Sequence, residues 1–166
     1  MEKKKIILDI RDFSVSFEQY EKGFRKTGLP VIRNLDVTVH EGEMVAVVGS
    51  SGSGKSLLAH GILGILPYNA STGGELLYDG APLTKERQKA LRGNEIVLVP
   101  QSVAFLDPLM KIGPQIRKGR RDKASGEKLR RIFEGYHLKE EVQELYPFEL
   151  YGGMNRRILV SSALMC

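Results

Sequence analysis

One stretch, Gly49-Ser50-Ser51-Gly52-Ser53-Gly54-Lys55-Ser56, decides the fold, because it matches the phosphate-binding pattern G-x-x-x-x-G-K-[ST] at every fixed position. Its glycines let the backbone adopt positive φ, so that successive N–H groups can converge on one anion. Lys55 adds a mobile positive charge for the outer phosphates, and the Ser56 hydroxyl is an oxygen ligand that suits Mg²⁺. The stretch therefore predicts a site for phosphate and its metal ion.

The residues on both sides of this stretch agree with a phosphate loop. The continuous apolar run Val45–Val48 precedes it and predicts a parallel strand buried on both faces. The residues after it predict a helix that stops at Pro67, with apolar positions at Leu57, Leu58, Ile62, Ile65 and Leu66. Strand, loop and helix thus occur in the required order, and the alternative is a glycine-rich turn without a ligand.

Length and composition predict one soluble domain with room for a small subdomain. The chain has 166 residues, of which 42% are apolar and 27% are charged. Much of its net charge of +5 lies in two clusters, Lys3–Lys5 and Arg117–Lys123. Solvated surface charge is the simplest interpretation of these clusters, and an acidic partner is the alternative.

Cysteine usage and hydropathy favour a cytosolic chain. Cys166 is the only cysteine, so the sequence predicts no disulfide framework and no thiol pair for a metal. Asp9 and Arg11 interrupt the apolar residues near the start, which argues against a signal peptide, and no apolar run approaches the length of a membrane span. We expect the chain to reach a membrane only through a partner.

Short alternating segments predict strands in the first part of the chain. The segment from Leu8 to Phe17 alternates around a register change at Arg11-Asp12, and Leu35–Val39 alternates again. These two strands are expected to be antiparallel, with Glu18–Pro30 as a connecting loop. The other elements expected before residue 101 are a turn at His40–Glu43, a strand and tight turn at Glu75–Gly80, a short helix from Thr84 to Leu91, and a buried strand at Ile96–Val99 that Pro100 stops.

After Gln101 the pattern changes from short strands to helices. One apolar stripe of helical spacing runs from Leu129 to Tyr136, and a second runs from Leu138 to Tyr146. These stripes predict a small helical subdomain that follows the strands.

A second motif, Tyr146-Pro147-Phe148-Glu149-Leu150-Tyr151-Gly152-Gly153-Met154, precedes a helical pattern. Gly152 and Gly153 are therefore expected at a helix N-terminus, where backbone N–H groups favour an anion. Together with the phosphate loop, Gln101 after a buried strand, and the helical segment between, this order resembles the ATP-binding cassette (ABC) family of transport ATPases. The resemblance extends over essentially the whole chain.

The resemblance implies a role for each motif. Gly49–Ser56 is similar to the family's Walker A loop, and Gln101 to the glutamine that reaches Mg²⁺ and the attacking water. Leu150–Met154 resembles the signature motif. Phe17 falls where the family often places an aromatic ring against adenine, with Tyr20 as a rival and an ordinary strand residue as the alternative.

ATP and Mg²⁺ are the cofactors that the resemblance implies. Lys55 and Gln101 are the expected catalytic residues, and Ser56 and Gln101 are the expected metal ligands. The expected nucleotide-binding residues are Phe17, Gly49, Ser50, Ser51, Gly52, Ser53, Gly54, Lys55, Ser56, Leu57, Tyr151, Gly152 and Gly153.

The implied fold is α/β, a P-loop NTPase of the ABC type with an N-terminal antiparallel β subdomain and a helical subdomain, without the C-terminal part of the core. Residues 1–166 are then a partial nucleotide-binding domain. The β subdomain and P-loop core take residues 1–101, the Q-loop and helical subdomain 102–151, and the signature helix 152–166.

Finer motifs point to one subgroup and its partners. Leu106-Asp107-Pro108, Ile112–Ile116 and the Tyr-Pro-x-Glu-Leu approach to Gly-Gly-Met resemble the subgroup that imports oligopeptides, dipeptides and nickel or metal chelates. The implied partners are a second ABC ATPase subunit, in a homodimer or heterodimer, the transmembrane permease subunits and, indirectly, an extracytoplasmic substrate-binding protein. The resemblance further implies that ATP closes the two cassettes at the cytoplasmic face of the cell membrane and that hydrolysis releases them.

Two departures from the family pattern matter. Tyr151 stands where the signature has serine, so a small hydroxyl is lost while the glycine N–H groups remain. Ile158–Cys166 matches the helix that precedes the Walker B strand, and the sequence stops there, without the aspartate, catalytic glutamate and switch histidine that follow in the family. His40, His60 and His137 all come earlier and are expected to be surface or packing residues.

These departures predict ATP binding without efficient turnover, because phosphoryl transfer depends on positioning and electrostatics. Uncovered apolar surface of an incomplete sheet predicts low solubility or dependence on a partner. A non-catalytic nucleotide-binding or regulatory fragment is the alternative function. A P-loop kinase has no need of Gln101 or Gly152-Gly153, and a nucleic-acid protein is disfavoured because Arg117–Lys123 has no interleaved aromatic residues.

Overall fold

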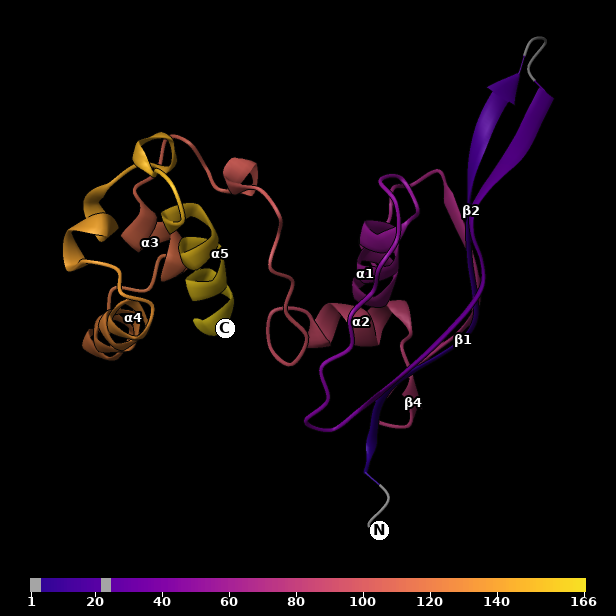
Figure 1. Ribbon diagram of the computed structural model, residues 1–166, viewed down its shortest axis with the longest axis horizontal. Coiled ribbons are helices and arrows are strands. Elements are labelled where there is room, and N and C mark those ends of the chain that lie inside the picture. Colours follow the sequence, from indigo (N-terminus) through magenta and orange to yellow (C-terminus); the bar gives the residue numbers. More distant parts are fainter. Residues whose placement is uncertain (1–3, 22–24) are drawn as a thin grey trace. The chain divides into compact units, whose positions relative to one another are not determined.

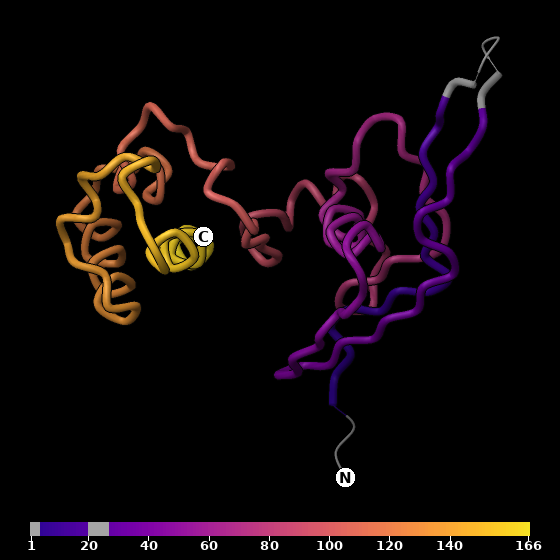
Figure 2. Tube along the Cα trace, turned by 45° about the horizontal axis from the view of Figure 1, so that its top comes forward, coloured from indigo at the N-terminus to yellow at the C-terminus, as the bar shows by residue number. Residues whose placement is uncertain are grey.

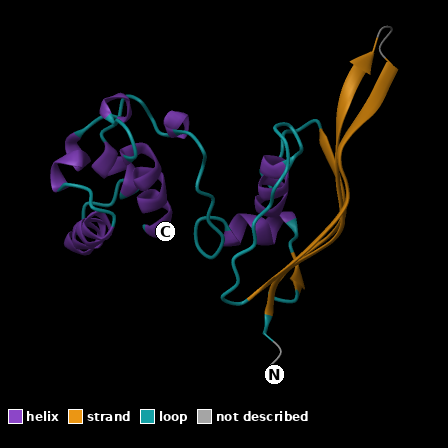
Figure 3. Ribbon diagram, in the orientation of Figure 1, coloured by secondary structure: helices purple, strands orange, loops and turns teal. Residues whose placement is uncertain are grey.

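The computed structural model describes residues 4–21 and 25–166, with the side chains of residues 20–21 and 25–26 outside that description. It divides the chain into two compact units, Met1–Arg92 and Gly93–Cys166 (Figure 1). All strands of the described residues belong to the first unit, whereas the second unit is built from helices and loops (Figure 3). No helix among the described residues is both long and apolar enough to span a bilayer.

Strands of the first unit form one antiparallel sheet in the order β2-β1-β3-β4 (Figure 1). The sheet consists of β1 (Ile6–Glu21), β2 (Arg25–His40), β3 (Ala70–Tyr78) and β4 (Ala81–Pro82). The antiparallel pair that the alternation predicted is confirmed. Its register shifts between Ile10 and Phe13, where Asp12 has a φ of 49°, so the predicted register change is also confirmed.

The hairpin of β1 and β2 is longer than the sequence predicted. Residues expected to form a loop at Glu18–Pro30 pair instead, from Ser16 opposite Pro30 to Glu21 opposite Arg25. Proline has no backbone N–H, but β2 is an edge strand with a neighbour on one side only. A missing N–H on the open side breaks no hydrogen bond between strands, so the edge strand tolerates Pro30. The loop prediction was therefore wrong, since residues that signal turns are also accepted in edge strands.

Helices α1 (Lys55–Leu63) and α2 (Lys85–Leu91) lie on the same side of the sheet (Figures 1 and 2). Gly61 of α1 lies against the Phe13 ring, and a Cβ atom at this position would stand 2.5 Å from the ring Cζ. Glycine is therefore required for this close approach of the helix to β1. The buried core between helix and sheet comprises Ile10, Phe13, Val15, Ile32 and Leu58.

The ends of these two helices show one error and one success of the sequence analysis. Helix α1 ends at Leu63, because Gly64 adopts the left-handed conformation with a φ of 64° and caps the helix before Pro67 is reached. The prediction of a helix that runs to Pro67 was therefore wrong. Thr84 caps α2 as predicted, since its Oγ1 accepts a hydrogen bond from Arg87 N at 3.3 Å.

Both predicted turns are confirmed. Glu43 N donates to His40 O at 3.1 Å, and His40 N donates to Glu43 Oε2 at 2.7 Å. This backbone hydrogen bond is the main reason why the pKa of the Glu43 carboxyl is lowered. Asp79 and Gly80 join β3 to β4 with φ values of 50° and 73°, as in a two-residue hairpin turn of type I′.

Two predicted buried strands, Val45–Val48 and Ile96–Val99, are not strands in the structure. A strand needs the N–H and C=O groups of a neighbour, and among the described residues only one such bond reaches either segment, from Gly93 N to Ile96 O. Apolar side chains in both segments are consequently exposed, and Val48 reaches 90%. Both strand predictions were wrong, whereas the expected uncovered apolar surface is present.

The second unit begins with a short helical turn at residues 103–105. Five further helices and helical turns follow and pack around one apolar core. Its elements are η1 (Val103–Phe105), α3 (Ile112–Ile116), α4 (Lys123–Gly135), η2 (Glu140–Glu144), η3 (Pro147–Glu149) and α5 (Met154–Leu164). The core comprises Ile112, Ile116, Leu129, Phe133, Leu138, Val142, Leu150, Met154, Ile158 and Met165.

The first of the two predicted apolar stripes is an α-helix and the second is not. Leu129 and Phe133 of α4 are buried, which confirms the stripe from Leu129 to Tyr136. Leu138 and Val142 are also buried, but they are reached through the left-handed turn at His137 (φ 52°) and the 3-10 turn η2. The prediction of a second α-helix was therefore wrong, because a turn brought the same spacing to the core.

Candidate functional site

The loop between Val48 and α1 keeps the conformation that its glycines allow. Gly52 and Gly54 have φ values of 81° and 89°, in the left-handed region that favours glycine. A Cβ atom on Gly54 would stand 2.8 Å from Ile32 Cγ1, so the loop passes close to β2. A Cβ atom on Gly49 would meet Ser53 Oγ at 2.7 Å. Glycine is therefore favoured at each of these three positions, by its positive φ at Gly52, by φ and the approach to Ile32 at Gly54, and by the approach to Ser53 at Gly49.

Lys55 is folded back over this loop. Its Nζ donates to Gly49 O at 2.7 Å, to Ser50 O at 2.6 Å and to Ser53 Oγ at 3.2 Å. An ammonium group has three protons, so all of its donors are engaged within the loop. An incoming phosphate must therefore replace at least one of these bonds, and the contact with Ser53 is the longest.

The start of α1 presents donors without partners. The N-cap residue Gly54 offers no side-chain cap, and the first turn contains no acidic residue. Among the described residues, the N–H groups of Gly52, Gly54 and Lys55 form no hydrogen bond, whereas Ser53 N donates to Ser50 O. Unpaired N–H groups and the positive end of the helix dipole together favour an anion at this position. The local geometry is suited to phosphate.

Three other predicted site residues also lie in the first unit. The Ser56 hydroxyl is exposed and has no hydrogen-bond partner among the described residues, so it can accept a metal ion. Phe17 of β1 and Leu57 of α1 are partly buried and pack against the core of this unit. The side chain of Tyr20, the rival for stacking on adenine, lies outside the described residues.

The remaining predicted site residues belong to the second unit. Gln101 is exposed, and its side chain has no hydrogen-bond partner in the described part of the chain. Tyr151 is 76% exposed, Gly152 has a φ of 54°, and Gly153 is the N-cap of α5. The expectation that the glycine pair lies at a helix N-terminus is confirmed. Tyr151 and both glycines line a cavity of about 590 Å³.

Arg157 holds the segment from Tyr151 to Gly153 in place, and the sequence analysis did not identify this residue. Its Nε donates to Gly153 O at 3.2 Å, and its Nη1 donates to Tyr136 O and His137 O, both at 3.2 Å. One guanidinium thus ties the start of α5 to the turn that follows α4. All three acceptors are backbone carbonyls, which residue type does not reveal. The sequence offers one weak signal for the contact with Gly153, namely the spacing of four residues between Gly153 and Arg157.

Replacing Arg157 with alanine should destabilise the second unit by about 1–3 kcal/mol, because three carbonyls lose a charged donor. Amide hydrogen exchange should accelerate at Met154 and Leu138, whose N–H groups donate to Tyr151 O and Phe133 O, and a general loss of surface charge does not predict this. Arg156→Ala is the matched control, since Arg156 is exposed and should change stability by no more than about 0.5 kcal/mol. Equal effects of the two substitutions would contradict the tether.

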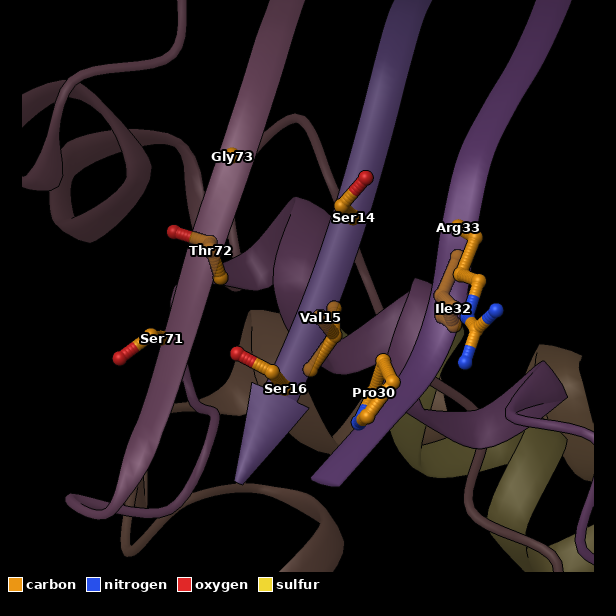
Figure 4. A pocket seen from close by; sticks show the side chains of 9 residues that line it. All are labelled: Ser14, Val15, Ser16, Pro30, Ile32, Arg33, Ser71, Thr72 and Gly73. Atoms are coloured by element: carbon orange, nitrogen blue, oxygen red, sulfur yellow. The ribbon is translucent and has the colours of Figure 1, made fainter. Parts of the chain in front are cut away.

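A cavity of 410 Å³ lies on the sheet, and no residue of the phosphate loop lines it. Figure 4 shows side chains from β1, β2 and β3 around it, including Ser14, Arg33 and Thr72. None of its lining residues belongs to the predicted site. The unpaired donors of the loop, and not the hollow on the sheet, therefore define the candidate site.

Comparison with known proteins assigns the family. The family model described as "ABC transporter" matches residues 32–166, and the chain belongs to this family. The family and the cassette fold that the sequence predicted are thereby confirmed.

Curated relatives are transport ATP-binding proteins. The chain is 28% identical to the oligopeptide transport ATP-binding protein OppD of Salmonella typhimurium, over 97% of this chain and 50% of that protein. It is 33% identical to the probable peptide ABC transporter ATP-binding protein y4tR of Sinorhizobium fredii, over 99% of this chain and 52% of that protein. The chain thus spans about half the length of the curated relatives it matches.

Solved structures show the same fold. The dimeric cassette MJ0796 superimposes with a TM-score of 0.75 at 20% identity, over 96% of this chain and 69% of that chain. The protein cbiO1 of Clostridium perfringens, part of the ABC transporter complex cbiONQ, superimposes with a TM-score of 0.70 at 18% identity, over 98% of this chain and 62% of that chain. At these identities the likeness concerns the fold alone.

Proposed function

We propose that this chain is the ATP-binding subunit of a membrane importer, in which ATP binding and hydrolysis drive the uptake of peptides. The observation that supports it most is the loop that ends at Lys55, with its unpaired N–H groups at the start of α1. The names of the relatives, which are oligopeptide and peptide transport proteins, support peptides as the cargo. Nickel or a metal chelate is the second cargo class that the sequence motifs suggest.

Within this proposal each site residue has a role. Lys55 contacts the outer phosphates, Phe17 stacks on adenine, and Ser56 and Gln101 hold Mg²⁺ through oxygen atoms. Both metal ligands are exposed and unpaired among the described residues, so their chemistry fits a hard cation. The metal, when bound, neutralises charge on the phosphates. The other nucleotide contacts are Gly49–Gly54 and Leu57.

Tyr151, Gly152 and Gly153 would serve the nucleotide of a second ABC subunit, in a homodimer or heterodimer. The dimeric form of the similar cassette MJ0796 supports this pairing. Residues 1–101, 102–151 and 152–166 would be the β subdomain with P-loop core, the Q-loop with helical subdomain, and the signature helix. Permease subunits would hold the pair at the cytoplasmic face of the membrane, and an extracytoplasmic binding protein would deliver the cargo.

The 166-residue chain by itself should bind MgATP and hydrolyse it poorly. It contains no apolar strand that ends in Asp-Glu, and the described residues hold no group of three or more His, Cys, Asp or Glu side chains that could bind a metal. These 166 residues then offer no carboxylate of such a strand to orient the attacking water, on which phosphoryl transfer depends. Equilibrium binding and phosphate release should be measured in the same samples.

Saturable MgATP binding with turnover far below about 1 s⁻¹ is the expected result. Turnover near that rate by a contaminant-free sample would contradict the deficiency, and absence of MgATP binding by a folded sample would contradict the whole proposal. A non-catalytic nucleotide-binding or regulatory fragment of a cassette protein is the second proposed function. An in-frame apolar strand with Asp-Glu directly downstream in the gene would exclude it.

A further inference from the structure

The largest basic cluster of this protein lies in one segment. Residues 117–131 contain eight Lys and Arg residues but only two acidic residues, a net charge of +6. The whole chain has a net charge of +5, so all other residues together carry −1. The charge is therefore a local feature of the second unit and not a property of the whole surface.

We call the Lys and Arg residues of this segment the basic face, and most of their side chains are exposed to solvent. Helix α4 turns Ser125, Leu129 and Phe133 into the core, which leaves its basic side chains on the outer side. Apart from the half-buried Arg117, all of the basic residues are exposed. The basic face comprises Arg117, Lys118, Arg120, Arg121, Lys123, Lys128, Arg130 and Arg131.

The two parts of the basic face, the loop before α4 and the helix itself, adjoin one another. Lys118 Nζ lies 3.0 Å from Cys166 Sγ, and Lys128 Nζ lies 3.3 Å from Cys166 O. A lysine of the loop and a lysine of the helix therefore lie beside the same residue, which brings the two parts of the basic face together.

Internal carboxylates neutralise little of this charge. Lys123 pairs with Glu127 and Arg130 with Glu134, each at 3.9 Å and on the surface, where such pairs interact weakly. Asp122 is engaged as the N-cap of α4, since it accepts a hydrogen bond from Ser125 N at 2.8 Å.

Three arginines of the basic face are free to bind. Within the described part of the chain, the guanidinium groups of Arg120, Arg121 and Arg131 form no salt bridge or side-chain hydrogen bond, although the charge of Arg120 helps to lower the pKa of the Asp122 carboxyl. Their guanidinium groups are the donors that recognise phosphate most effectively.

The shape of the basic face selects the kind of ligand. None of the cavities of 410, 700 and 590 Å³ is lined by a residue of 117–131. The segment contains no aromatic residue on which bases could stack. A broad positive surface without a pocket is suited to an extended anionic surface, and clusters of four to eight basic residues are typical of contacts with acidic lipids.

We propose that the basic face binds the phosphate head groups of an anionic lipid membrane. The contact is electrostatic only, because the apolar side of α4 is already buried in the core of the second unit. It therefore depends on salt and on the charge of the lipid and not on bilayer insertion. It does not depend on the bound nucleotide.

The test measures binding of the full chain to vesicles of phosphatidylcholine with and without about 30 mol% phosphatidylglycerol. We compare wild type with Arg120→Glu/Arg121→Glu and with the control Lys85→Glu/Lys89→Glu. Both double variants change the net charge equally, but Lys85 and Lys89 are exposed residues of α2 in the first unit. Thermal melts confirm that all three proteins fold alike, and MgATP binding is measured on the same samples.

Wild type should bind the anionic vesicles at least about tenfold more tightly than the neutral ones. Arg120→Glu/Arg121→Glu should lose most of this preference, and the control should keep it. Raising the salt from about 0.01 M to about 1 M shortens the Debye length from roughly 30 Å to roughly 3 Å and should abolish binding. MgATP binding should be unchanged in both variants, so a failure of the lipid contact is distinguishable from a failure of nucleotide binding.

Three outcomes would overturn the proposal. Equal wild-type binding to neutral and anionic vesicles would exclude a charge-driven contact. An equal loss in the two double variants would assign binding to the net charge of the molecule. Tighter binding to polyglutamate than to vesicles of the same charge concentration would identify an acidic polypeptide as the partner.

Discussion

Replacing Lys55 with alanine should weaken MgATP binding by about tenfold to a hundredfold. A hydrogen bond to a charged group contributes about 1.5–3 kcal/mol, and each 1.4 kcal/mol corresponds to a factor of ten. The loss has two sources, because Lys55 Nζ supplies charge to the phosphate and also bridges Gly49 O, Ser50 O and Ser53 Oγ. Isothermal titration of wild type and variant with MgATP measures the effect.

Two comparisons separate these sources. AMP lacks the outer phosphates, so its affinity should fall less than that of ATP if the charge of Lys55 matters most. Lys89→Ala is the matched control, because it removes an exposed lysine of α2 outside the loop and should leave MgATP binding unchanged. Equal MgATP binding by wild type and Lys55→Ala, with both proteins folded, would refute the candidate site.

The sequence predicted best where the structure is determined locally. The loop at Gly49–Ser56, the turn at Asp79-Gly80 and the cap at Thr84 each depend on backbone conformations or hydrogen bonds within a few residues. Such features are encoded by residue type and spacing alone. Their positions were therefore predicted correctly before any tertiary contact was known.

Predictions failed where distant contacts decide the structure. Val45–Val48 has the composition of a buried strand, but a strand forms only if another segment supplies hydrogen bonds, and no described residue does. The stripe from Leu138 to Tyr146 failed for the opposite reason, because the left-handed turn at His137 and the 3-10 turn η2 bury the same positions as a helix.

The candidate site divides in the same way. The phosphate loop was predictable from its glycines, Lys55 and Ser56, whereas the tether of Arg157 was not. Its acceptors include Tyr136 O and His137 O, which lie 21 and 20 residues earlier in the chain. Backbone carbonyls leave no trace in residue type, so no sequence pattern could have indicated this contact.

Truncation of Phe133 to alanine should reduce the free energy of unfolding of the second unit by about 3–5 kcal/mol. Phe133 is 1% exposed and belongs to the core that α4 and α5 share, so its removal leaves a cavity and deletes many packing contacts. Domains are stable by only about 5–15 kcal/mol, so the second unit should be partly unfolded in the variant. Amide hydrogen exchange, which reports each unit separately, measures the loss.

Phe105→Ala is the matched control for this prediction, since Phe105 is in the same unit but 70% exposed. Phe105→Ala deletes the same side-chain atoms as Phe133→Ala, but from an exposed position, and should change the free energy of unfolding by no more than about 0.5 kcal/mol. Exchange at the buried amides of β1 should be unaffected by either substitution if the two units unfold independently. Equal effects of Phe133→Ala and Phe105→Ala would mean that α4 does not pack as described, and the outward direction of the basic face, which depends on that packing, would be wrong as well.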